Sequence, residues 1–173
     1  SMKDPSNPSP VEDLLAILEA TRPDVVYTHN LADKHATHVA VTAAVLKALR
    51  SLPPDTQPKQ VLGCEVWRGL DWMLDADKSL LDVSGRPNLA AAIGGIFDSQ
   101  IAGGKRYDLA VQGRRLANAT FFDSHSVDDV EQLWFAMDLT PLVNDPSLDP
   151  VEFAAAFIQR FEKDVRSSLA NYF

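Results

Sequence analysis

The hydrophobic positions of the chain recur with two periods, and they predict helices that alternate with short strands. Apolar residues at helical spacing predict a helix over 11–20, which Pro23 ends. The short apolar run 24–29, with its Val-Val pair, predicts a buried strand. Helical spacing returns over 35–50, and a proline-rich loop follows it. The first third of the chain is therefore predicted as helix, strand and helix.

The same alternation continues through the rest of the chain with weaker patterns. Strands are predicted over 60–67, 80–83 and 133–142, and helices over 89–100, over 107–121 and from Pro150 onward. No internal repeat interrupts this order. We therefore expect an α/β fold with a mostly parallel sheet and flanking helices.

Length and composition favour a single domain. The chain has 173 residues, 46% of them hydrophobic, which suits one core. Residues 1–10 are rich in Pro, Ser and Asn and predict a linker or an added tail. Residues 11–173 are then expected to form one domain.

Charge and cysteine content exclude several classes of protein. A net charge of -8 argues against a nucleic-acid partner, which a basic surface would attract. Cys64 is the one cysteine, so a disulfide within the chain and a cysteine-rich zinc knuckle are both excluded. No apolar run approaches the roughly 18 residues of a membrane span. Any metal ligands must come from His, Asp or Glu.

Three of the four histidines fall within ten residues. His35 and His38 lie three apart at the start of a predicted helix, so both project from one face. His29 ends a predicted strand, where α/β sheets commonly bind ligands. Asp33 and Asn30 lie close in sequence and could orient a histidine through its second ring nitrogen. The cluster predicts a metal site, although an isolated His-x-x-His pair also occurs in proteins without one.

Residues 23–29 (PDVVYTH) and 33–41 (DKHATHVAV) resemble the second signature of the PIG-L/LmbE-like deacetylases. Asp98-Ser99-Gln100, after an alanine-rich helix, resembles that family as well. The resemblance implies a Rossmann-like α/β zinc enzyme that removes acetyl groups from N-acetylglucosamine-type sugars or glycoconjugates. We expect such an enzyme to be cytoplasmic.

The resemblance also implies roles for individual residues. His38 would be a zinc (Zn2+) ligand, and His35 would stabilise the oxyanion or protonate the leaving amine. The family's Asp within the motif is replaced by Thr37 here, so we assign its orienting role to Asp33. In such a site zinc polarises the acetamide and activates water, and a carboxylate takes the proton. The role of His29 is left open.

The family's other signature, A-H-P-D-D-E, does not occur in these 173 residues. That signature supplies the remaining metal ligands and the general base. We therefore expect the chain to be the C-terminal portion of a deacetylase, inactive alone, with the missing N-terminal segment of the same fold as its partner. Two alternatives remain: a non-catalytic binding or interaction domain with a residual histidine pair, and a self-contained metal site. The residues of the latter would be His29, Asp33, His35 and His38.

Substrate contacts are expected on both sides of the histidine cluster. We assign Asn30 and Arg68 to substrate binding. Arg68 lies between Trp67 and Trp72 after a predicted strand, and aromatic rings pair well with sugar faces. The alternative is that both tryptophans belong to the core and that Arg68 forms a surface ion pair.

Overall fold

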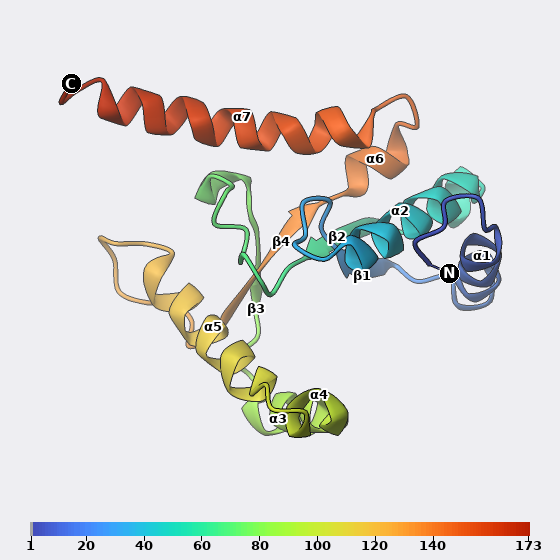
Figure 1. Ribbon diagram of the computed structural model, residues 1–173, viewed down its shortest axis with the longest axis horizontal. Helices are drawn as coiled ribbons and strands as arrows, with labels where there is room; N and C mark the ends of the chain where they lie inside the picture. The colour runs from blue at the N-terminus through green and yellow to red at the C-terminus, as the bar shows by residue number, and fades with distance from the viewer. Residues whose placement is uncertain (1) are drawn as a thin grey trace. The chain divides into compact units, whose positions relative to one another are not determined.

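The structure, a computed structural model, describes residues 2–173, and its helices and strands are labelled in Figure 1. The elements in chain order are α1 (Ser9–Thr21), β1 (Val25–His29), α2 (Ala36–Ser51), β2 (Gln60–Cys64), β3 (Ser79–Asp82), α3 (Pro87–Gly95), α4 (Asp98–Ala102), α5 (Tyr107–Phe121), β4 (Leu133–Asp138), α6 (Thr140–Asn144) and α7 (Pro150–Leu169). The α/β class predicted from the sequence is confirmed. We predicted one domain over 11–173, and within it the structure distinguishes two compact units.

The four strands form one sheet in the order β1-β2-β4-β3. β1 and β2 are parallel and joined through α2, with Val25 opposite Gln60 and His29 opposite Cys64. β4 runs antiparallel to β2, and the bond from Val83 N to Gln132 O sets the end of β3 against the start of β4. The prediction of a mostly parallel sheet is therefore wrong for these strands. β1 and β2 are linked by α2, the kind of crossover connection that parallel neighbours require.

The first unit comprises residues 2–79 and 136–173 and contains most of the core. α2 turns its small and aliphatic side chains inward, and Ala48 and Leu49 are fully buried. Val61 and Leu62 of β2 are also buried, because a strand inside a sheet hides both faces. α2 contacts β1, which sets the start of the helix beside the end of that strand.

The second unit, residues 80–135, contains α3, α4, α5 and parts of β3 and β4. Asn118 of α5 donates a hydrogen bond from Nδ2 to Leu133 O at 3.1 Å, which ties the helix to β4. The helix predicted over 89–100 is two helices here. The strand predicted over 133–142 ends at Asp138, and α6 follows it.

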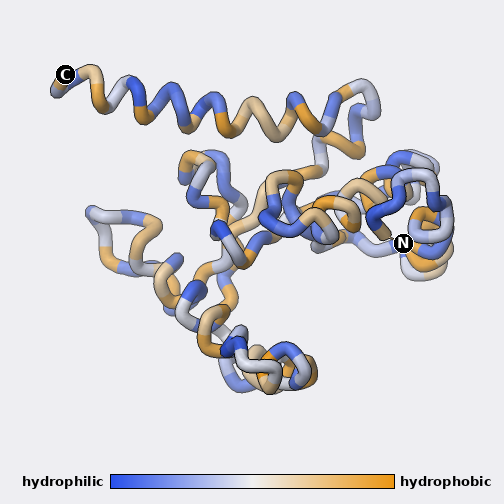
Figure 2. Tube along the Cα trace, in the orientation of Figure 1, coloured by the Kyte–Doolittle hydropathy of each residue, from blue (hydrophilic) through white to orange (hydrophobic). Residues whose placement is uncertain are grey.

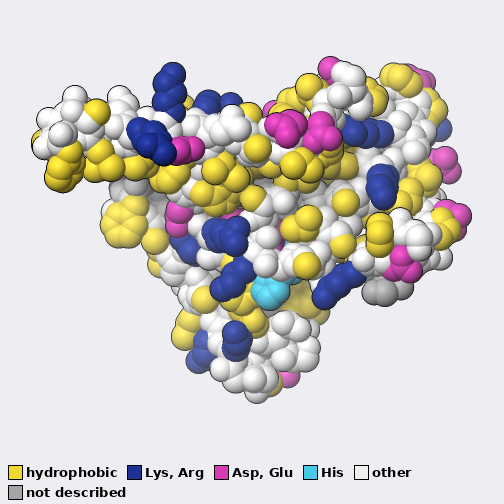
Figure 3. All heavy atoms as spheres, turned by 45° about the horizontal axis from the view of Figure 1, so that its top comes forward, with side chains coloured by type: hydrophobic (Ala, Val, Ile, Leu, Met, Phe, Trp, Pro, Cys, Tyr) yellow, Lys and Arg dark blue, Asp and Glu magenta, His cyan; other side chains and the backbone are white. Residues whose placement is uncertain are grey.

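The last helix, α7, is amphipathic and lies in the first unit. Asp149 caps it by accepting hydrogen bonds from Val151 N and Glu152 N at 2.7 and 3.0 Å. Apolar and polar positions alternate along it (Figure 2), and hydrophobic side chains form a row on the face seen in Figure 3. None of its residues is buried. Within residues 2–173, no helix has both the length and the apolar character that crossing a membrane requires.

Candidate metal centre

The histidine corner, residues 29–38, connects the end of β1 to the first turn of α2. His29 is the last residue of β1, and His38 is the third residue of α2. The buried hydroxyl of Thr42 donates to His29 O at 2.8 Å and lies 3.2 Å from His38 O. One side chain of α2 therefore holds the helix start against the strand end.

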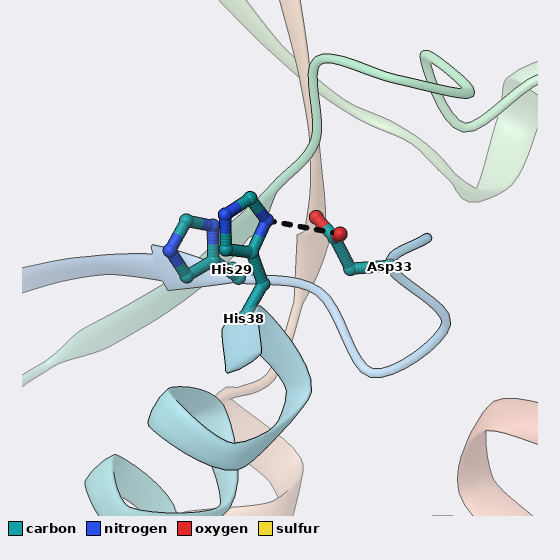
Figure 4. Close-up of side chains that lie close together, drawn as sticks. All are labelled: His29, Asp33 and His38. Carbon is teal, nitrogen blue, oxygen red and sulfur yellow. Dashed lines mark hydrogen bonds and ion pairs between the residues drawn. The ribbon is translucent and has the colours of Figure 1, made fainter. Parts of the chain in front are cut away.

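Asp33 is the buried carboxylate of the corner. Its Oδ1 accepts a hydrogen bond from His35 N at 2.8 Å and lies 3.0 Å from His38 Nδ1 (Figure 4). An ionised carboxylate only accepts hydrogen bonds, so this contact requires the proton of His38 on Nδ1. The Nε2 lone pair of His38 is then available to a metal, and a carboxylate behind a histidine is the usual support of such a ligand.

The imidazole rings of His29 and His38 stack on one another. Their centroids are 3.9 Å apart and their planes differ by 4°. Burial lowers the pKa of His29, the neighbouring His38 lowers it further, and Asp33 opposes both effects. A lowered pKa keeps the His29 ring neutral at pH 7, which is the form that binds metals.

His29, Asp33 and His38 could together hold a metal ion. One potential ligand atom from each lies within 4.8 Å of the others. A metal lies in the plane of an imidazole that binds it, and two parallel planes cannot contain the same ion. Joint coordination therefore requires one of the two rings to tilt out of the stack.

A pocket of about 300 Å³ opens beside these three residues. Its wall contains side chains from the ends of the two parallel strands and the segments after them. The lining residues are Tyr27, Thr28, His29, Asp33, His38, Cys64, Glu65, Val66 and Trp67. The position agrees with the rule that ligands bind at the carboxyl ends of parallel strands.

The remaining predicted site residues lie around the corner without entering the metal cluster. His35 is exposed, its ring 5.1 Å from that of His38 and 4.7 Å from that of Trp67. Asn30 is fully buried and accepts a hydrogen bond from Ala32 N at Oδ1. Arg68 is exposed and donates from Nη1 to Ala32 O at 2.8 Å. The catalytic role of His35 and the substrate contacts of Asn30 and Arg68 stay predictions.

Glu65 is a site residue that the sequence analysis missed. The predicted strand ran to Trp67, but β2 ends at Cys64, so Glu65 lies directly beyond the strand. It is 3% exposed and lines the pocket. A charged residue inside an otherwise apolar run was the signal that could have found it.

Comparison of the chain with models of known protein families, with curated proteins and with solved structures gives no match. A fold class alone does not define a function. The function must therefore be argued from the chemistry of the histidine corner and its pocket.

Proposed function

We propose that this chain carries part of the metal site of a zinc-dependent hydrolase that removes acetyl groups from N-acetylglucosamine-type substrates. The observation that supports it most is the convergence of His29, Asp33 and His38 within 4.8 Å at the edge of a pocket. Imidazole nitrogens are common zinc ligands, and a carboxylate behind a histidine is the usual support of such a ligand. The resemblance of residues 23–41 to the PIG-L/LmbE-like deacetylases supplies the reaction and the substrate class.

In this proposal the residues of the corner have separate roles. His38 would bind the metal through Nε2, with Asp33 holding its ring in position through Nδ1. His29 would add a second ligand if its ring tilted out of the stack. A bound zinc ion would supply Lewis-acid activation of the acetamide and of water. The exposed His35 would stabilise an oxyanion or pass a proton to a leaving amine.

The chain needs further ligands and a base for turnover, and we propose that a second polypeptide segment provides them. Catalytic zinc sites commonly have three protein ligands. β1, which carries His29, has β2 as its only neighbour in the described sheet, and its other edge is open. A further strand parallel to β1 would place its own carboxyl end next to His29. This is the role we assign to a segment that carries the A-H-P-D-D-E signature.

A non-catalytic binding domain is the second candidate function. The stacked arrangement of His29 and His38 supports it, because two parallel rings do not converge on one ion. In that case the corner would retain the fold of a hydrolase without its chemistry.

Acetate release separates the two candidates. N-acetylglucosamine and zinc are added to the chain alone and to the chain mixed with a polypeptide that carries A-H-P-D-D-E, and acetate is measured by NMR. We expect little release from the chain alone and zinc-dependent release from the mixture, lost again with His38→Ala. Absence of release from both samples, with zinc bound, would contradict the deacetylase proposal and favour the binding domain.

A further inference from the structure

Glu65 lies beside the metal cluster because β1 and β2 end together. Cys64 is opposite His29 in the parallel register, so Glu65 is the first residue beyond the paired strands. Its side chain lines the pocket that His29, Asp33 and His38 also line. It is nevertheless not a member of the cluster whose ligand atoms lie within 4.8 Å of one another in residues 2–173. We therefore look for a role of Glu65 other than that of a ligand in this cluster.

The carboxylate of Glu65 is buried, and no donor among residues 2–173 meets it at full hydrogen-bond geometry. Both Oε1 and Oε2 are inaccessible to solvent, and neither meets a donor at hydrogen-bond geometry in the described chain. Burial raises the pKa of this carboxyl and Asp33 raises it further, while the nearby N–H groups of Leu70, Trp72 and Arg68 offset part of the rise. These three N–H groups satisfy the buried carboxylate only in part. Because a buried acid with unmet hydrogen-bonding capacity is unfavourable for folding, a group on a bound molecule is a natural further partner.

The charges around the pocket specify the chemistry of that partner. Asp33 and Glu65 are both acidic and both line the pocket. The two nearest basic residues in sequence do not line the pocket: Lys34 Nζ lies 5.5 Å from the ring centre of Trp67, which is a lining residue, and Arg68 binds Ala32 O. The buried hydroxyl of Thr28, another lining residue, also lacks a partner. The pocket therefore offers acceptors and negative charge.

We propose that Glu65 turns its covered carboxylate into the pocket and recognises the bound molecule there, accepting hydrogen bonds from its hydroxyl or amine groups. The pocket then selects neutral or cationic molecules rich in such donors, such as amino sugars, and rejects anions. This inference rests on the proposed function only in treating the pocket as a substrate site. It adds a specificity-determining residue, directly beyond the end of β2, to a corner built on β1 and α2.

The test compares Glu65→Gln with wild type and with Glu19→Gln, a matched change at an exposed position of α1. The probes are N-acetylglucosamine, glucosamine and inorganic phosphate, titrated against tryptophan fluorescence because Trp67 lines the pocket. We expect wild type and Glu19→Gln to bind both sugars and not phosphate. Glu65→Gln should bind the sugars roughly 10-fold or more weakly, the size of a hydrogen bond to a charged group, and should melt at the same or a higher temperature.

Three results would overturn the inference. The first is that Glu65→Gln binds the sugars as wild type does and melts several degrees lower, which would assign the carboxylate to holding the turn at Arg68–Trp72. The second is that wild type binds neither sugar. The third is that Glu65→Gln loses zinc affinity as fully as His38→Ala, which would make Glu65 a metal ligand. A wild-type chain that binds sugar at Glu65 but binds no zinc instead contradicts the proposed hydrolase and leaves this inference standing.

Discussion

At the scale of single residues, Asp33 organises the histidine corner. One oxygen of its buried carboxylate accepts from the backbone of His35 and faces the ring of His38. The first contact shapes the turn that begins α2, and the second sets which ring nitrogen of His38 carries the proton. Asp33 should thus act on the metal through His38 as a positioning residue.

Asp33→Asn is predicted to weaken zinc binding by about 10–100-fold, the usual cost of replacing the partner of a metal-binding histidine. An amide is a weaker acceptor than a carboxylate and no longer favours the Nδ1–H form of His38. Isothermal calorimetry at pH 7 measures the change. The far-UV circular dichroism spectrum should stay that of wild type, and an unchanged zinc affinity would remove Asp33 from the metal site.

Glu65 predicts a pH dependence of stability. Its pKa in the folded chain is raised above the ordinary value of 4.5, so the folded state binds the proton more tightly than the unfolded state does. Tighter proton binding by Glu65 in the folded chain stabilises the fold below about pH 4.5. This contribution to the free energy of unfolding is lost as the pH rises through the pKa of Glu65 in the folded chain. Glu65→Gln should therefore be more stable than wild type near pH 7, and the difference should shrink toward pH 4.

Urea unfolding across pH 4–8 measures this difference between Glu65→Gln and wild type. A constant difference at every pH would show that Glu65 does not titrate abnormally. Glu19→Gln provides the baseline, since its side chain is exposed.

At the scale of elements, the close approach of β2 to the end of β1 depends on Gly63. A Cβ atom added there would lie 2.9 Å from Leu139 Cδ1, 3.0 Å from Asn30 Cα and 3.1 Å from His29 O. Two of these three atoms belong to the backbone of the histidine corner and cannot move aside as a flexible side chain would. The geometry of the metal centre therefore requires a residue without a side chain at position 63 of the neighbouring strand.

Gly63→Ala is predicted to destabilise the first unit by about 1–3 kcal/mol, the usual cost of overpacking, and to weaken zinc binding as well. Gly113→Ala is the matched control, because nothing lies within 4 Å of a Cβ at that position of α5. It should stabilise its helix by about 0.5–1 kcal/mol. Chemical unfolding gives both values, and equal effects of the two substitutions would contradict the close approach.

The elements themselves were largely predictable because their signals are local. The apolar stripe of α1, the Val-Val pair of β1 and the prolines after α2 predicted these elements to within a few residues. The direction of β4 was not predictable, because strand pairing depends on contacts between residues far apart in sequence. The histidine corner was predictable because its three histidines lie within ten residues of one another. Glu65 was not, because only the pairing of β1 with β2 brings it close to them.

At the scale of the whole molecule, β1 presents an unpaired edge and an uncovered face. Asn30 N bonds to Cys64 O and Gln60 N bonds to Asp24 O, so the even-numbered residues of this stretch point their backbone groups at β2. The backbone groups of Tyr27 then point to the open edge. The Tyr27 side chain is 64% exposed, unusual for an aromatic residue in a parallel strand. An open apolar edge is a place where another strand can add.

Hydrogen exchange tests that edge. In the chain alone, the Tyr27 amide should exchange much faster than the Thr28 amide, which faces β2. Binding of a completing segment should protect Tyr27 and leave Thr28 nearly unchanged. Equal protection of both amides in the monomeric chain would contradict an open edge.

Zinc binding by the histidine corner is the claim on which the proposed function depends, and calorimetric titration of zinc into the chain at pH 7 tests it most directly. We predict one zinc ion per chain, with affinity reduced in His38→Ala by more than the roughly 10–100-fold that loss of an orienting partner costs. His125→Ala, an exposed histidine of the second unit, should bind zinc as wild type does. Zinc affinity that is the same in wild type, His38→Ala and His125→Ala, or absent from all three, would contradict the assignment of this corner as a metal centre.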